Sequence, residues 1–174
     1  ATALVQRARH HHMQVIGTAS SAEKRAYALE NGANAVIEPD TAPLPDKVKA
    51  LTDGRGVDLA FDHVGGALFI ACIRSLAPLG TAISYNIVSG PPAGDVFMEL
   101  RALLGRSLAV RTFSIHTFDQ DRTQRRALMQ NAIDLMAAGH TQAPRTTVLP
   151  LAEVRQVHAL LDAGQTLGKL VLRP

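Results

Sequence analysis

The stretch Gln14–Lys24, with the sequence QVIGTASSAEK, constrains the fold of this chain more than any other segment. Val15 and Ile16 are β-branched and a glycine follows them, which predicts a short buried strand that ends in a turn. Ser20 followed by Glu23 has the spacing of a capping box, which predicts that a helix begins here. A strand, a tight turn and a capped helix make half of a βαβ unit, so the segment favours a parallel α/β fold.

The same segment indicates which nucleotide this helix N-terminus would bind, because the free amides of a helix N-terminus attract phosphate. Dinucleotide folds that prefer NAD commonly carry an acidic residue at the end of this strand, where it holds the ribose 2′-hydroxyl. Here no acid occurs before Glu23. The hydroxyls of Thr18, Ser20 and Ser21, with Lys24 one turn into the helix, suit a 2′-phosphate instead, and we therefore predict NADP(H). An ordinary capped helix with a surface lysine is the alternative.

Composition bounds the class of protein without indicating its chemistry. The chain has 174 residues, of which 47% are hydrophobic, so it has the size of one domain and enough apolar residues for a sizeable core. Its net charge is +3, and the 18 basic residues are scattered without interleaved aromatic residues, which excludes a nucleic-acid footprint. No apolar run approaches the roughly 20 residues that span a membrane. The single Cys72 leaves no disulfide framework, and we expect a cytoplasmic protein.

Strands and helices alternate along the whole chain, which predicts a mostly parallel sheet covered by helices on both faces. Besides the strand at Val15, short apolar runs predict strands at Ala33–Ile37, Val57–Phe61, Thr81–Tyr85, Ser107–Phe113, Arg145–Leu149 and Lys169–Leu172. Helical spacing or composition predicts helices at Ala1–His12, Ala22–Asn31, Asp46–Asp53, Val96–Leu104 and Arg122–Ala138. A further helix is predicted from the apolar stripe Leu68, Phe69, Cys72, Ile73 and Leu76, and a short last helix ends at Ala163. Gly80 is expected to precede its strand, and Pro43–Pro45 to break the chain.

Three consecutive histidines, His10 to His12, close the first predicted helix. Consecutive helical residues point in different directions, whereas a two-histidine metal site usually requires the spacing i,i+4, so we expect no metal here. Helices usually close on glycine, and a left-handed His12 costs about 1 kcal/mol relative to glycine. Cys72 lies on an apolar helical stripe, and we expect it to pack in the core.

Three sequence blocks carry a family resemblance that extends over nearly all of the chain. They are VIGTASSAEKRAYALENGANAVI, GRGVDLAFDHVGG and PLAEVRQVHALLDAGQTLGKLVL. Together they resemble the quinone oxidoreductase branch of the medium-chain dehydrogenase/reductases, to which the zeta-crystallin-like NADPH:quinone reductases belong. The resemblance implies that residues 1–174 form an NADP-binding, Rossmann-like doubly wound domain. It also implies that the strand region at about 145–174 returns toward a catalytic domain.

The resemblance implies parts that these residues do not include. Family members carry an N-terminal barrel-like domain, then a central strand and a glycine-rich phosphate loop of the type AAGGVG. The expected domain is therefore incomplete at its N-terminus, and its sheet lacks its first strand. We expect the 174 residues by themselves to fold poorly and to show no NADPH-dependent quinone reduction.

The activity that the resemblance implies is hydride transfer from NADPH to a quinone or an α,β-unsaturated carbonyl, without zinc. Because the cofactor carries that chemistry, no catalytic nucleophile is expected. By resemblance, Thr18, Ser20 and Lys24 hold the 2′-phosphate, and the residues along the ribose and nicotinamide are His63, Val64, Tyr85 and Asn86. Asp62 is expected to fix a turn by hydrogen bonds, and Lys169 lies either near the cofactor or on a solvated strand edge.

The predicted partners are a small-molecule substrate and a second copy of the chain. Ser107–Phe113 has alternating apolar residues at an expected sheet edge, which favours pairing into a homodimer in the full-length protein. The alternative function is a non-catalytic one, as a truncated remnant or a nucleotide-binding or structural module. A barrel domain and phosphate loop encoded in frame upstream would favour the enzyme.

Overall fold

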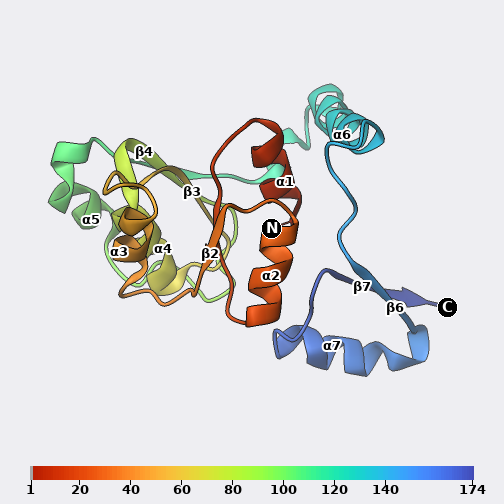
Figure 1. Ribbon diagram of the computed structural model, residues 1–174. Coiled ribbons are helices and arrows are strands. Elements are labelled where there is room, and N and C mark those ends of the chain that lie inside the picture. Colours follow the sequence, from red (N-terminus) through yellow and green to blue (C-terminus); the bar gives the residue numbers. More distant parts are fainter. Residues whose placement is uncertain (1) are drawn as a thin grey trace. The chain divides into compact units, whose positions relative to one another are not determined.

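The computed structural model describes residues 2–174, so Ala1, which was expected in the first helix, lies outside the described part (Figure 1). These residues divide into two compact units. The first comprises the described residues up to Gly17 together with Ser21–Val36 and Leu128–Pro174. The second comprises Thr18–Ser20 and Ile37–Ala127.

Helices and strands alternate, as the sequence predicts. The helices are α1 (Thr2–His10), α2 (Ala22–Glu30), α3 (Leu44–Ala50), α4 (Gly66–Arg74), α5 (Val96–Ala102), α6 (Arg122–Ala137) and α7 (Val154–Asp162). The strands are β1 (Ile16–Thr18), β2 (Ala35–Ile37), β3 (Val57–Asp62), β4 (Leu76–Ser84), β5 (Ala109–Thr112), β6 (Thr146–Pro150) and β7 (Lys169–Arg173). None of the helices among residues 2–174 combines the length and the apolar character that crossing a membrane requires.

The strands of the described residues pair into three sheets, β1–β2, β3–β4–β5 and β6–β7. The pairs β3–β4, β4–β5 and β6–β7 are parallel. The α/β class and the parallel pairing are therefore confirmed.

The sheet β3–β4–β5 carries the core of the second unit. β4 lies in the middle, and α4 packs on the sheet (Figure 1). The helix is apolar nearly all round, which is the pattern of a helix that is buried on several sides. The buried residues of this core are Phe69, Ile70, Ile73, Leu76 and Ala82.

Strand β4 begins five residues earlier than the predicted Thr81–Tyr85, so Gly80 lies inside the strand and Leu76 belongs to β4 rather than to the helix. The helix ends early because the Ser75 hydroxyl donates to the carbonyl of Ala71, at 2.7 Å, inside its last turn. Such back-bonding competes with continuation of the helix.

The predicted cap of α2 is wrong by one residue. Ser21, and not Ser20, is the N-cap, and its hydroxyl oxygen accepts from the backbone N–H of Lys24 at 3.2 Å. The reason is that β1 continues through Gly17 to Thr18, which moves the turn and the last extended residue along the chain. The strand is half-buried instead of buried.

Other boundaries also follow local chemistry. Pro45 lies in the first turn of α3, where a residue without an N–H is tolerated, so the expected break at Pro43–Pro45 is wrong. The first helix ends at His10, two residues before the predicted end at His12, and His12 has a left-handed φ of 57°. In α6 the apolar residues Leu128 and Ile133 remain about half exposed.

The first unit contains the β6–α7–β7 unit at the C-terminal end of the chain. The two strands pair residue for residue, from Thr146 with Lys169 onward. Contacts tie this region to α2: the Arg145 N–H donates to the Tyr27 hydroxyl at 2.9 Å, and the Arg145 guanidinium lies 5.2 Å from the Tyr27 ring centroid. Both ends of the chain therefore contribute to one compact unit.

Candidate functional site

The carboxyl ends of β3, β4 and β5 lie level with one another at one edge of the sheet. Asp62 pairs with Ser84, and Ser84 pairs with Thr112. Just beyond, the Tyr85 N–H donates to the Asp62 carbonyl at 3.0 Å, and the Phe113 N–H donates to the Ser84 carbonyl at 2.9 Å. The residues that follow the three strands therefore meet at the edge where open α/β sheets bind ligands.

Asp62 fixes the turn after β3. This residue is only 2% exposed, and its carboxylate accepts from the backbone N–H groups of Val64 at 3.1 Å and Gly65 at 2.8 Å. Gly65 has a φ of 79°, and a Cβ there would collide with the carbonyl oxygen of Gly90. The structural role predicted for Asp62 is confirmed. The close approach of Gly65 to the Gly90 carbonyl also fixes how this turn packs on the loop that follows β4.

His63 and Tyr85 follow neighbouring strands, and the structure brings their rings together. The ring centroids lie 5.8 Å apart with the planes inclined by 26°, which is a stacked arrangement. Burial, and then the negative charge of Asp62, raises the pKa of the Tyr85 hydroxyl, which therefore stays protonated at neutral pH. Val64 and Asn86 adjoin the two rings in the chain, and the Val88 N–H donates to the His63 carbonyl at 3.1 Å. Four of the seven predicted site residues thus belong to one edge.

The three residues predicted to hold a 2′-phosphate do not belong to one unit. Thr18 and Ser20 are exposed residues of the second unit, and Lys24 belongs to the first. The Lys24 ammonium donates to the backbone carbonyl of Gly164, just after α7. An ammonium carries three donor hydrogens, so this bond leaves two for another acceptor. The grouping of these three residues remains a prediction.

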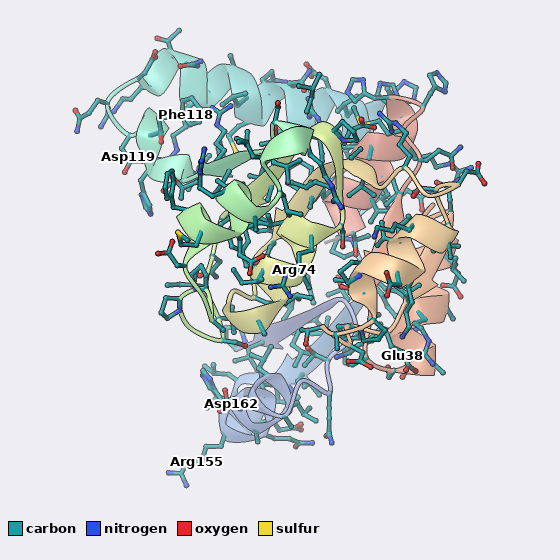
Figure 2. All side chains as sticks on the ribbon, turned by 90° about the vertical axis from the view of Figure 1, so that its left-hand side faces the viewer. Glu38, Arg74, Phe118, Asp119, Arg155 and Asp162 are labelled. Carbon is teal, nitrogen blue, oxygen red and sulfur yellow. The ribbon has the colours of Figure 1, made fainter. Side chains whose placement is uncertain are left out.

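A further side-chain cluster, in the segment that follows β5, was not predicted. His116 lies in a short 3₁₀ turn, Ile115–Phe118, beyond β5, and its Nδ1 lies 2.9 Å from the Oδ2 of Asp119. The other carboxylate oxygen accepts from Arg125 Nη1 at 2.5 Å. Figure 2 shows Phe118 and Asp119, adjacent in the chain, in the segment before α6. The signal that could have indicated this cluster is the sequence Ser114-x-His116-x-x-Asp119, because the Ser114 hydroxyl oxygen caps the turn by accepting from the His116 N–H.

His10, in the run of three histidines, contacts His140, a contact that the sequence did not indicate. The rings of His10 and His140 have centroids 4.2 Å apart. Desolvation lowers the pKa of His10, and the neighbouring imidazoles, with His140 first, lower it further. Within residues 2–174, no group of three or more histidine, cysteine or acidic side chains is arranged to hold a metal ion.

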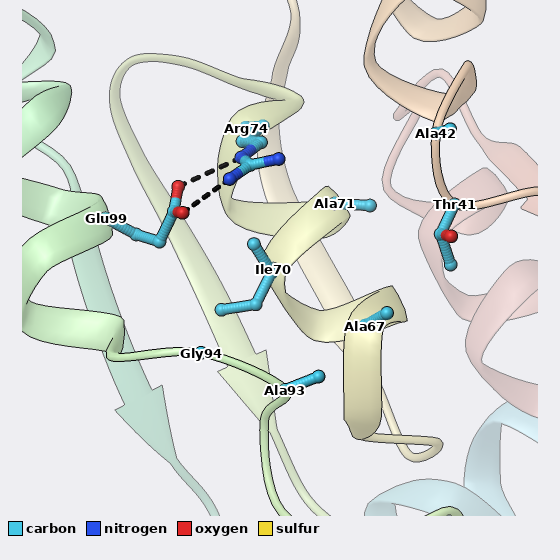
Figure 3. A pocket seen from close by; sticks show the side chains of 9 residues that line it. All are labelled: Thr41, Ala42, Ala67, Ile70, Ala71, Arg74, Ala93, Gly94 and Glu99. Carbon is cyan, nitrogen blue, oxygen red and sulfur yellow. Dashed lines mark hydrogen bonds and ion pairs between the residues drawn. The ribbon is translucent and has the colours of Figure 1, made fainter.

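A hollow of about 310 Å³ lies beside α4 (Figure 3). Arg74 and Glu99 close one side of it with a two-pronged ion pair, at 2.9 and 2.5 Å, which lowers the pKa of Glu99. The other lining residues are mostly alanines. Since the two charged groups satisfy each other, the hollow offers few polar groups to orient a ligand, and the strand edge is the better candidate site.

Comparison with known proteins gives a consistent result. The family described as zinc-binding dehydrogenase matches residues 1–138. A 2-haloacrylate reductase of a Burkholderia species is 28% identical over 98% of this chain and 51% of its own length. A quinone oxidoreductase of Pseudomonas aeruginosa is 29% identical over 93% of this chain and 49% of its own length. This chain therefore spans about half the length of these relatives.

A solved structure supports the same fold. The quinone oxidoreductase of Escherichia coli, solved in complex with NADPH, superposes with a TM-score of 0.87 at 25% identity, over 99% of this chain and 53% of that one. This similarity confirms the Rossmann-like expectation. The chain belongs to the zinc-binding dehydrogenase family, within the quinone-oxidoreductase-like branch of the medium-chain dehydrogenase/reductases.

Proposed function

We propose that this chain is the cofactor-binding part of an NADPH-dependent oxidoreductase that transfers a hydride to a quinone or an α,β-unsaturated carbonyl. The stacked pair His63 and Tyr85, at the shared carboxyl edge of β3 and β4, is the observation that carries the proposal. Quinone and 2-haloacrylate reductases among the relatives support the reaction class.

The residues present suit NADPH. No acidic side chain stands at the end of β1, and Lys24 keeps donor capacity for a phosphate beside its bond to Gly164. NADPH, when bound, supplies a hydride from its nicotinamide ring. The role of this chain is to bind and orient it: Asp62 fixes the turn that carries His63 and Val64, while Tyr85 and Asn86 follow the next strand. These rings and amide offer flat apolar contact and hydrogen bonds to the ribose and nicotinamide.

The reaction is tested on the intact protein that contains this chain, by following NADPH absorbance with a quinone and with an enone as acceptors. We expect NADPH oxidation with one or both acceptors. Tight NADPH binding without oxidation of any acceptor would support the non-catalytic alternative.

Cofactor preference is tested by the variant Lys24→Ala. Removing one charge-assisted contact to a 2′-phosphate weakens NADPH binding by about 1–3 kcal/mol, while NADH binding stays nearly unchanged. Fluorescence titration with both cofactors measures the two affinities, and Lys49→Ala, on α3, is the matched control. Equal losses for NADPH and NADH in Lys24→Ala would contradict the assignment.

We further infer a cytoplasmic homodimer joined through β5. The strand lies at one edge of its sheet, next to β4 only, and Val110 is its half-buried apolar residue. Such an edge favours pairing with a second copy. Light scattering of the intact protein at micromolar concentration should give the mass of a dimer, and a clean monomer would overturn this inference.

A further inference from the structure

We propose that His116 is the proton donor of this reaction, a role that rests on the proposed function. Hydride transfer to an enone or a quinone leaves negative charge on the substrate, and a positioned acid is needed to neutralise it. The three-residue cluster of His116, Asp119 and Arg125 has the arrangement of such an acid.

The ring of His116 is held by one of its two nitrogens. Nδ1 lies 2.9 Å from Asp119 Oδ2, and Arg125 lies 2.5 Å from the other oxygen of that carboxylate. Within residues 2–174, the contacts described for the ring involve Nδ1, and none involves Nε2. A carboxylate on Nδ1 orients an imidazole and fixes which nitrogen carries the outward-facing proton. The His116 side chain is 78% exposed, so Nε2–H is available to a substrate.

His116 follows β5 in the chain, and β5 ends at the edge that carries the candidate site. Thr112 pairs with the last residue of β4, and the Phe113 N–H donates to the Ser84 carbonyl, so this segment leaves the sheet at the same edge as His63 and Tyr85. The rings of Phe113 and Phe118 have centroids 6.3 Å apart on either side of His116 in the chain. A flat, conjugated acceptor prefers such an aromatic surface.

The proposed step adds a hydride and a proton to the carbon–carbon double bond of an enone. The hydride forms a C–H bond at the β-carbon of the enone, the carbon–carbon π bond breaks, and its electrons form an enolate. The Nε2–H proton of the His116 imidazolium is transferred to the α-carbon, which forms the second C–H bond. The substrate is reduced by two electrons, the nicotinamide is oxidised, and neutral His116 recovers a proton from water. Asp119 is a positioning residue, and Arg125 holds its carboxylate.

The test uses the intact protein with His116→Asn, whose amide still donates to Asp119, and His158→Asn on α7 as the matched control. For an enone, kcat/KM of His116→Asn should fall about 10²- to 10⁴-fold, the usual contribution of a general acid. The pH profile of the rate should differ between the unmodified protein and the variant. In deuterated water, the unmodified protein should deuterate one face of the α-carbon, and the variant both faces.

A readout independent of turnover is binding of 4-nitrophenolate, an anion that resembles the enolate. Its dissociation constant should rise about 10- to 100-fold in His116→Asn, the effect of losing a charge-assisted hydrogen bond, and stay unchanged in His158→Asn. His116→Gln repeats the comparison if the first variant is unstable, with the NADPH dissociation constant and the melting temperature as checks on folding.

The outcomes separate the two proposals. If the unmodified protein reduces no acceptor, the proposed function fails. If it reduces the enone and His116→Asn keeps the same rate, pH profile and single-face deuteration, the proton-donor role is overturned while the proposed function stands. Tyr85 is then the competing proton donor, and Tyr85→Phe would show the loss of kcat/KM and of single-face deuteration instead.

Discussion

Two βαβ units of this chain have the same local architecture and different burial. In β3–α4–β4 and in β6–α7–β7, a helix of nine residues joins two parallel strands. Helix α4 buries Phe69, Ile70, Ala71 and Ile73, whereas α7 buries Val157 among its described residues. The helix of the first βαβ unit is therefore part of a core, and the helix of the second covers its sheet with a narrow apolar stripe.

Composition explains this difference. The sequence of α4, GALFIACIR, is apolar over most of its circumference, whereas α7, VRQVHALLD, alternates apolar with polar residues. A helix of the first kind is stable only when several elements cover it, and one of the second kind needs one covered face. The local apolar pattern therefore determines that a helix forms, while the number of elements packed against that helix determines how much it contributes to the free energy of unfolding.

The largest effect should come from truncating matched aliphatic residues in the two helices. Ile73 and Leu161 are each the second-last residue of their helix, but Ile73 is 0% exposed and Leu161 is 50% exposed. Ile73→Ala should lower the free energy of unfolding by about 2–5 kcal/mol, because it leaves a cavity. Leu161→Ala should cost less than about 1 kcal/mol. Denaturant unfolding of both variants measures the difference, and equal losses would remove the contrast.

A smaller effect should come from glycines at the ends of the same two helices. Gly65 precedes α4, and a Cβ there would collide with the Gly90 carbonyl, whereas Gly164 follows α7 with a φ of 63° and has open space within 4 Å of the point that a Cβ would occupy. Gly65→Ala should therefore lower the free energy of unfolding by about 2–4 kcal/mol, from the collision and the left-handed backbone together. Gly164→Ala should cost about 1 kcal/mol, from the backbone alone. Thermal melting checks both, and a larger loss in Gly164→Ala would show that the α7 end is the more constrained one.

Much of the fold could be predicted because its signals are local. The apolar run of β3, the apolar stripe of α4 and the turn acid Asp62 all indicate their structure within a few residues. The boundaries failed where two local options compete: Ser20 and Ser21 can both cap a helix, and only the length of β1 decides between them. Likewise, Leu76 fits both a helix stripe and a buried strand, and the Ser75 back-bond selects the strand.

The candidate site was predictable only in part. His63 and Tyr85 follow consecutive parallel strands, whose ends must meet, so their proximity could be inferred. The bond from Lys24 to Gly164 joins residues 140 positions apart and has no local signal. His116 was missed because it lies with Asp119 in an irregular segment while Arg125 lies on the next helix, so no helical or strand period relates the three side chains.

The half-buried Cys72, which lies outside the core cluster, bears on how these residues would withstand the reactive acceptors proposed as substrates. Desolvation, with the nearby charge of Asp62, raises the pKa of this thiol to about 12. At neutral pH only about one molecule in 10⁵ then carries the thiolate, which is the form that adds to activated double bonds. Cys72 is the one cysteine of the sequence. The enones proposed as substrates are electrophiles that alkylate thiolates, so we expect the desolvation of this thiol to slow its alkylation by such an acceptor.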